Sequence, residues 1–191
     1  MTKNSQKLKA FCILAILAAL IFLLGLTPLG LIPLGFVNVT ILCIPVIVGT
    51  LYLGRKSGLI LGATFGLVSF ISALIKPSTL VATLMGKSPL LVALMSILPR
   101  LVVPLTAYAV YQAMNKQNET VRTAVAAVFG SLTNTVLYLG LMLFFYVLAG
   151  LDTAGVLALI GGIALLAGGC EAIVAAILCT PILAAVKKIK I

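Results

Sequence analysis

The sequence predicts an all-α integral membrane protein with six transmembrane helices and both termini in the cytoplasm. Hydrophobic residues make up 63% of the 191 and charged residues only 8%, whereas a soluble domain carries about a quarter charged residues. One crossing of the hydrocarbon core takes roughly 20 helical residues. The length therefore allows six crossings with short connections, and we expect a single transmembrane domain over residues 1–191.

The positive charges predict how the chain is oriented. Ten of the thirteen lysines and arginines fall in four clusters between apolar runs: Lys3, Lys7 and Lys9; Arg55 and Lys56; Lys116 and Arg122; Lys187, Lys188 and Lys190. Clusters at alternate junctions are what the positive-inside rule produces, so we expect these loops and both termini on the cytoplasmic side. The net charge of +10 therefore indicates topology, and we expect no nucleic-acid partner.

The apolar runs at the start of the chain define the first two spans. Residues 11–26 form the first, and no cleavage site of small residues follows, so we expect a retained helix and not a signal peptide. Prolines and glycines crowd residues 25–35 and predict a turn-rich loop near the membrane surface. The second span is expected over residues 36–53, ending at a cationic cluster.

The third span is expected over residues 58–75, where Gly58, Gly62 and Gly66 form two GxxxG steps that let another helix approach closely. A polar external loop, residues 76–88, follows it.

The fourth helix has two possible starts. A start at Pro89 would put Arg100 near the bilayer centre. A start near Leu98, running to Asn115, would leave the arginine near the outer surface and a proline in the first turn, where its missing N–H costs nothing. We expect the second, with residues 89–97 as an apolar flap.

The last two spans follow two long apolar runs. The fifth is expected over residues 123–148. The final run, residues 155–186, is long enough for two spans, but two would put the terminal lysines outside, against the charge rule. We therefore expect one long helix that starts near Gly161.

Composition excludes most catalytic chemistry, so we expect no enzyme, no metal and no cofactor. The chain has no histidine, and its carboxylates are Glu119, Asp152 and Glu171. His-based proton transfer and His-ligated metals are therefore absent. Residues 85–88 resemble the end of a phosphate-binding P-loop, but the earlier glycine and an acidic partner for Mg²⁺ are missing. The chain is not expected to hydrolyse ATP.

Arg100 and Glu171 are the charges expected within spans. Charged groups are expensive in lipid and point inward, toward each other or toward a ligand. One interpretation is a structural ion pair. The other is that Arg100 binds a substrate carboxylate through two parallel hydrogen bonds while Glu171 accepts hydrogen bonds from substrate hydroxyls. A contact between Arg100 and a lipid headgroup is a third.

A polar stripe on the fifth span indicates the wall of a pocket. Its members fall within about 100° of one another at 3.6 residues per turn; they are Ser131, Asn134, Thr135 and Tyr138. Hydrogen bonding between helices is the alternative reading. Asn38 and Thr40 open the second span and either join the same site or cap the helix.

Several segments, taken in order, carry a resemblance to a known family. They are residues 27–30 (TPLG), 44–49 (IPVIVG), 53–58 (LGRKSG), 98–100 (LPR), 130–135 (GSLTNT) and 171–175 (EAIVA). With its length and six spans, the chain resembles the substrate-binding S-components of energy-coupling factor (ECF) vitamin transporters. Within that family the pattern is most similar to the pantothenate-specific branch.

The resemblance implies a function and partners. Such proteins capture a vitamin from outside, associate with a membrane coupling subunit and two cytoplasmic ATPases, and reorient in the bilayer to release the vitamin inside. It also implies that the AxxxA face of the first span, Ala15 and Ala19, docks onto the coupling subunit. This division of labour fits a chain that has no nucleotide site of its own.

The candidate residues suit a small acid. Pantothenate has a carboxylate for Arg100, an amide for Asn134, and hydroxyls for Glu171, Ser131 or Tyr138. Riboflavin needs stacking surface that a chain without tryptophan supplies poorly, and cationic thiamine would be repelled by the arginine. Folate is the closest competing vitamin. A stand-alone secondary carrier or channel is the alternative class, but it would need internal symmetry or an ionisable relay, and neither is found.

Overall fold

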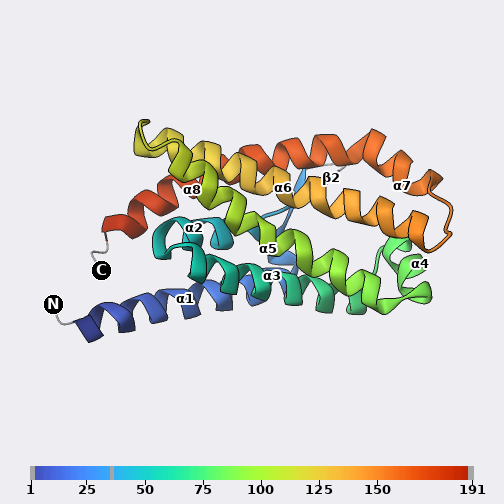
Figure 1. Cartoon of the computed structure of the whole chain (residues 1–191), viewed down its shortest axis with the longest axis horizontal. Coiled ribbons are helices and arrows are strands. Elements are labelled where there is room, and N and C mark those ends of the chain that lie inside the picture. Colours follow the sequence, from blue (N-terminus) through green and yellow to red (C-terminus); the bar gives the residue numbers. More distant parts are fainter. Residues whose placement is uncertain (1–2, 35–36, 189–191) are drawn as a thin grey trace.

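The structure is a computed structural model that describes residues 3–34 and 37–188, with the side chains of residues 3, 31–39 and 163–165 left out of the description. Five long helices lie along the long axis of a bundle (Figure 1): α1 Lys3–Leu26, α3 Arg55–Ile75, α5 Pro89–Ala113, α6 Glu119–Leu148 and α8 Leu165–Lys188. Three shorter helices complete it: α2 Cys43–Leu53, α4 Thr79–Lys87 and α7 Ala154–Leu159. The start of α1 and the end of α8 lie at the same end (Figure 1).

In the described part of the chain, five helices are long and apolar enough to cross a membrane: α1, α3, α5, α6 and α8. The sixth expected span is represented by α2, whose 11 residues rise about 16 Å at 1.5 Å per residue. That length is about half of a hydrocarbon core, so α2 cannot cross the membrane by itself.

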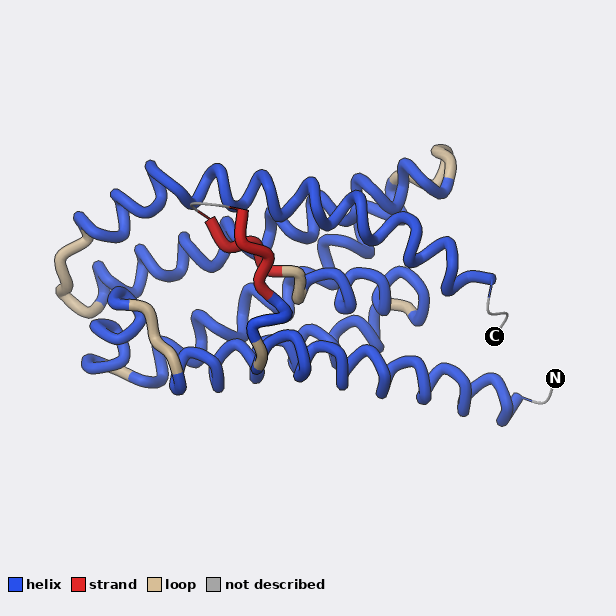
Figure 2. The backbone as a smooth tube through the Cα atoms, turned by 180° about the vertical axis from the view of Figure 1, so that it is seen from behind, coloured by secondary structure: helices blue, strands red, loops and turns tan. Residues whose placement is uncertain are grey.

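A β-hairpin occupies the place where the second span was predicted to begin, so its expected start at residue 36 is wrong. Strands β1 Leu31–Leu34 and β2 Val37–Thr40 pair antiparallel with Leu31 opposite Thr40. β-Branched residues in β2 favour an extended backbone. Figure 2 shows the hairpin on the rear of the bundle, where it leads into α2. Non-helical backbone is tolerated at membrane depth when it is buried in protein or lines a cavity.

Helix α5 is continuous from Pro89, so the predicted start near Leu98 and the apolar flap are wrong. Pro89 occupies the first turn, where a missing N–H is harmless. Pro99 and Pro104 lie inside the helix, and each removes one main-chain hydrogen bond. Arg100 consequently lies near the middle of α5. The polar loop predicted before this helix is largely the short helix α4, which begins at the N-cap Ser78.

The glycine face of α3 packs on α5, as its GxxxG steps predicted. A Cβ added at Gly66 would lie 2.9 Å from the Cα of Ile97, and one at Gly62 would lie 2.5 Å from the backbone oxygen of Arg100. Backbone meets backbone at both positions. Because Gly62 and Gly66 have no side chains, α5 can approach α3 this closely. This contact fixes how deeply α5, and with it Arg100, lies in the bundle.

The final apolar run is one helical segment, as predicted, although it begins earlier than expected. Helix α7 leads through the π-helical turn Ile160–Ala164 into α8. Thr135 of α6 lies opposite Gly168 of α8, where an added Cβ would be 3.0 Å from the threonine methyl carbon. This close approach brings Glu171, one turn further on, against α6.

Two buried apolar clusters fill the bundle, and Arg100 lies between them on α5. Val103 belongs to the cluster shared with α2, α3, α6 and α8, whereas Met95 belongs to a cluster shared with α4, α6 and α7. Tyr146 of α6 fixes α4 by donating a hydrogen bond to the backbone oxygen of Leu80 at 2.6 Å.

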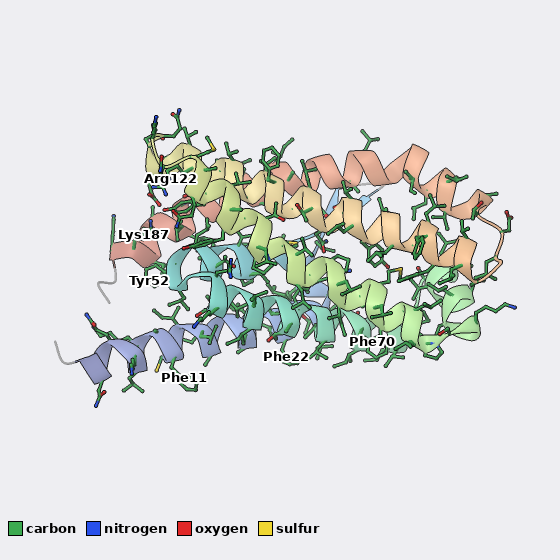
Figure 3. All side chains as sticks on the ribbon, in the orientation of Figure 1. Phe11, Phe22, Tyr52, Phe70, Arg122 and Lys187 are labelled. Atoms are coloured by element: carbon green, nitrogen blue, oxygen red, sulfur yellow. The ribbon has the colours of Figure 1, made fainter. Side chains whose placement is uncertain are left out.

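A polar network joins α5, α6 and α8 at the end that carries both termini. Glu119 accepts hydrogen bonds from the Tyr111 hydroxyl and the Lys187 ammonium. Arg122 donates to the backbone oxygen of Tyr111 at 3.2 and 3.3 Å and lies over its ring, 4.0 Å from the centroid. Figure 3 shows Arg122 and Lys187 together at this end.

Replacing Gly66 with alanine is expected to destabilise the protein by about 1–3 kcal/mol, the cost of overpacking, less a gain of up to about 1 kcal/mol in helix propensity. The new Cβ would press on the Ile97 backbone, which cannot move away like a flexible side chain. Thermal unfolding in detergent measures the effect.

Gly140→Ala is the matched control, because Gly140 lies in α6 and nothing is within 4 Å of an added Cβ. That variant is expected to be as stable as the wild type or slightly more so. Equal melting temperatures for the two variants would contradict the close approach of α3 and α5.

Candidate functional site

A cavity of about 280 Å³ lies between the end of α1, the residues after it, α3, α5 and α6. Arg100 and Asn134 line it from the bundle interior, and Thr27, Ser72 and Lys76 line it where α1 and α3 end. The volume is close to the lower end of the range found for small-molecule sites, about 300–1,000 Å³. The cavity therefore suits a ligand at the small end of that range.

Arg100 is held in place by neighbours that leave part of its guanidinium free. It is 8% exposed, and its Cζ lies 4.7 Å from the ring centroid of Tyr138 and 5.3 Å from that of Phe65. Both rings are within the roughly 6 Å over which a cation is attracted to a π face. Its Nε is buried and has no hydrogen-bond partner among the described residues.

Pro99 explains the hydrogen bond that the arginine does make. In an α-helix the oxygen of Met95 would accept from the N–H of residue 99, but proline has none. Arg100 donates to this Met95 oxygen from Nη1 at 3.1 Å instead. Pro99 thus leaves free the Met95 oxygen that orients the guanidinium of the next residue, Arg100.

Asn134 gives the inner end of the cavity a second unsatisfied polar atom. The side chain is buried, and its Oδ1 has no hydrogen-bond partner in the described structure. Leaving a buried polar atom unpaired costs about 1–3 kcal/mol. An unpaired donor on Arg100 and an unpaired acceptor on Asn134, two residues that line one cavity, indicate a ligand that carries an acceptor and a donor.

Glu171 binds the β-hairpin and does not pair with Arg100. Its Oε1 accepts from the backbone N–H of Thr40 at 3.0 Å and from the Thr40 hydroxyl at 2.9 Å. Its Oε2 accepts from the Thr135 hydroxyl at 3.4 Å. No ion pair joins Glu171 to Arg100, both of which are described residues. The carboxylate therefore connects the end of β2 to α8 and α6.

The structure brings part of the predicted site together. Arg100, Asn134 and Thr40 line the cavity, and Tyr138 stacks on the arginine. Ser131 is buried on the same helix, one turn before Asn134, and is not among the lining residues. Glu171 reaches the site through Thr40.

Asn38 pairs with Pro33 in the hairpin through its backbone, and its side chain lies outside the described residues. Thr40 does not act as a helix cap, because α2 begins only at Cys43.

Sequence reasoning missed the contribution of α3 to the cavity. Phe65, Ser69, Ser72 and Lys76 all line it. Their spacing of four, three and four residues is a single helical face, which is the signal that the apolar surroundings obscured. One face of α3 therefore forms a wall of the cavity, while α5 contributes Arg100 and α6 contributes Asn134.

Ala15 and Ala19 lie on the exposed side of α1, away from this cavity. The same helix exposes Phe11 by 66% and Phe22 by 43%, and Figure 3 labels both of these rings on α1. In the described residues α1 is the least buried of the long apolar helices. An apolar, weakly covered helix of this kind is suited to contact with lipid or another membrane protein.

The bundle, its long apolar helices and the cavity with a buried cation define a helical membrane protein that can hold a small polar ligand. A profile of the family described as "ECF transporter, substrate-specific component" matches residues 9–183. The chain belongs to this family of transporter substrate-binding components. It is a multi-pass protein of the bacterial cell membrane.

A relative with a more specific name is the Pantothenic acid transporter PanT of Lactococcus lactis subsp. cremoris (strain MG1363). The two chains are 30% identical over 118 residues, which cover 58% of this chain. The match spans 59% of the relative's own length.

Thr40→Val is expected to lower the stability of the protein by about 1.5–3 kcal/mol, the contribution of a hydrogen bond to a charged group. Valine keeps the shape of threonine and the backbone bond to Glu171 but removes the hydroxyl. Thermal unfolding in detergent, together with hydrogen exchange of the hairpin amides, measures the loss.

Thr40→Ser is the matched control, because it keeps the hydroxyl and loses only a methyl group. It is expected to remain closer to the wild type in both measurements. A Thr40→Val protein as stable as the wild type would show that Glu171 does not hold the hairpin.

Proposed function

We propose that this chain is the high-affinity vitamin-binding subunit of an ECF-type ABC importer and that its substrate is pantothenate. The observation that carries the proposal is that Arg100 and Asn134 line one cavity and that, among the described residues, Nε of the first and Oδ1 of the second are buried without a hydrogen-bond partner. A buried cation without an anionic partner favours an anionic ligand, because the pair replaces the water that burial removed. Residues 1–191 act as a single substrate-binding domain.

Pantothenate matches these groups in chemistry and size. Its carboxylate would accept hydrogen bonds from the free side of the guanidinium, which is the geometry that planar carboxylates prefer. Its amide N–H would donate to Asn134 Oδ1. Its geminal dimethyl group suits the apolar wall that Leu24, Leu26 and Leu42 provide. The similarity to the Pantothenic acid transporter PanT supports the same choice.

The remaining polar side chains are assigned to two roles. Some bind the alcohol end of the substrate, and others hold the β-hairpin or the first two site residues in place. Thr40 lines the cavity, so its hydroxyl is the group best placed to exchange a hydrogen bond with a substrate hydroxyl. Glu171 then acts by orienting Thr40, to which it is already bonded. Ser131 and Tyr138 support Asn134 and Arg100 from the same helix face.

We propose six membrane crossings with both termini in the cytoplasm. The β-hairpin and α2 together would complete the crossing that α2 is too short to make. The start of α3, with Arg55 and Lys56, and the α5–α6 turn and start of α6, with Lys116 and Arg122, lie toward the end of the bundle that also carries both termini (Figure 1). Lys76 ends α3 and Lys87 ends α4, toward the other end. More cations on one side is the pattern of a cytoplasmic face. The cavity then opens outward, where α3 ends.

The energy for uptake is proposed to come from partner subunits. Neither a nucleotide motif nor a metal-ligand cluster occurs among the described residues. The exposed Ala15 and Ala19 would let a helix of a membrane coupling subunit approach α1 closely, because small residues allow such packing. Two cytoplasmic ATPases would drive the assembled complex.

Arg100→Ala is expected to weaken pantothenate binding by about 2–5 kcal/mol, the cost of truncating one partner of a buried charged pair. That energy is roughly thirty- to several-thousand-fold in affinity. Arg100→Lys keeps the charge but loses the planar fork, so it should bind less well than the wild type. Isothermal titration calorimetry on purified protein measures both variants.

Pantothenol, the alcohol analogue without the carboxylate, makes this test specific. The wild type should strongly prefer the acid, and a folded Arg100→Ala protein should lose most of that preference. If the preference were unchanged, Arg100 would not contact the carboxylate, and the case for an acidic vitamin would fail.

Ala15→Phe and Ala19→Phe are expected to abolish ATP-dependent uptake by the full complex while leaving pantothenate affinity unchanged. A bulky ring would hold the coupling subunit away from α1 but would not reach the cavity. Uptake into liposomes with and without the partner subunits measures the first effect, and calorimetry the second.

Val136→Phe is the control, since Val136 is 65% exposed on α6 and also presents its side chain to lipid. It should leave both activities intact. Equal loss of binding and uptake in the Ala15→Phe protein, or concentrative uptake by this chain alone, would contradict the proposed coupling.

A further inference from the structure

A polar stripe on α3 leads from Arg100 to the outer end of the cavity. Phe65, Ser69, Ser72 and Lys76 follow one another at four-, three- and four-residue intervals and all line the cavity. At 100° per residue these positions fall within about 60° of one face. The stripe begins at the ring on which Arg100 stacks and ends at an exposed lysine.

Lys76 and the Phe65 ring on which Arg100 stacks lie at opposite ends of this stripe. Eleven residues separate Phe65 from Lys76, which is about 16 Å along a helix. The Debye length at physiological ionic strength is about 8 Å. An anion in the water at the cavity mouth is therefore about two Debye lengths along α3 from Phe65, the ring beside Arg100, whereas Lys76 lies at the mouth itself.

Lys76 has an ammonium group that is available to bind an anion at the cavity mouth. It ends α3, where its backbone N–H bonds to the Ser72 oxygen at 2.9 Å, and within the described structure its ammonium takes part in no ion pair. Lys87, at the end of α4, is an exposed cation near the same end of the bundle but does not line the cavity.

We infer that Lys76 is a specificity-determining residue that captures an anionic substrate at the mouth of the cavity, before the carboxylate passes along Ser72 and Ser69 to Arg100. The inference rests on the proposed function and adds to it a path and a kinetic role. A charge at the rim of a binding site acts on the association rate and its salt dependence more than on the dissociation rate. Selection for an acid then begins outside the site.

Binding kinetics of radiolabelled pantothenate, measured by rapid filtration on protein in phosphatidylcholine nanodiscs, tests the inference. Lys76→Gln is expected to lower the association rate constant by about three- to tenfold and to leave the dissociation rate within about twofold. Raising the ionic strength from about 0.01 M to about 1 M, which shortens the Debye length roughly tenfold, should remove the difference from the wild type.

Lys87→Gln is the matched control, because it removes the same charge from the same end of the molecule. It should change the association rate far less, and neither variant should alter association of the uncharged pantothenol. Equal slowing by both variants, an unchanged association rate in Lys76→Gln, or an effect confined to dissociation would overturn the role given to Lys76. A wild-type protein that binds no pantothenate would overturn the proposed function, and this inference with it.

Discussion

A buried positive charge near the middle of α5 is the constraint on which the rest of this structure depends. A cation at that depth costs about 2.5–3.5 kcal/mol even when a helix carries it into a bilayer. Three local features offset the cost: the ring of Tyr138, the ring of Phe65 and the carbonyl of Met95. None of them is an anion. The charge is thus stabilised enough to stay folded into the bundle and remains available to a negatively charged ligand.

The proline before the arginine links local sequence to this site. Pro99 removes the main-chain donor that would occupy the Met95 oxygen, and the guanidinium takes its place. Pro104 likewise removes the main-chain donor that would bond to the oxygen of Arg100. This oxygen lies against α3 at Gly62. Pro99 thus frees an acceptor for a side chain, and Pro104 lies where the glycine face of α3 approaches α5 closely.

Five of the six expected spans correspond to long apolar helices in the described residues, in the predicted order, because these helices depend on hydrophobic length and charge alone. The start of α5 could not be predicted, because a lone arginine avoids the bilayer centre, whereas Arg100 is surrounded by two aromatic rings and a free carbonyl that come from distant parts of the chain or from a proline effect. The hairpin was missed for a related reason: hydropathy does not distinguish an apolar strand packed on protein from an apolar helix in lipid.

The candidate site could be predicted where it depends on single polar residues in apolar helices, and could not be predicted where it depends on contacts between distant residues. Arg100 and Asn134 stood out because polar groups are rare in spans, and the structure places both on the cavity. The role of Glu171 depends on Thr40, which is 131 residues away in sequence, and no local pattern predicts such a pair. Ser69 and Ser72 lie on a helix whose glycines drew attention to packing, so their alignment with Lys76 emerged only from the cavity.

The identity of a molecule that copurifies with the protein tests the central claim most directly. Protein purified gently in detergent from cells grown with pantothenate, then denatured and analysed by mass spectrometry, should release one small carboxylic acid with the mass of pantothenate. Arg100→Ala protein prepared in parallel should release little or none. Recovery of a cationic or uncharged molecule from the wild type, or equal recovery of the acid from both proteins, would contradict the account of the buried arginine as the group that selects the substrate.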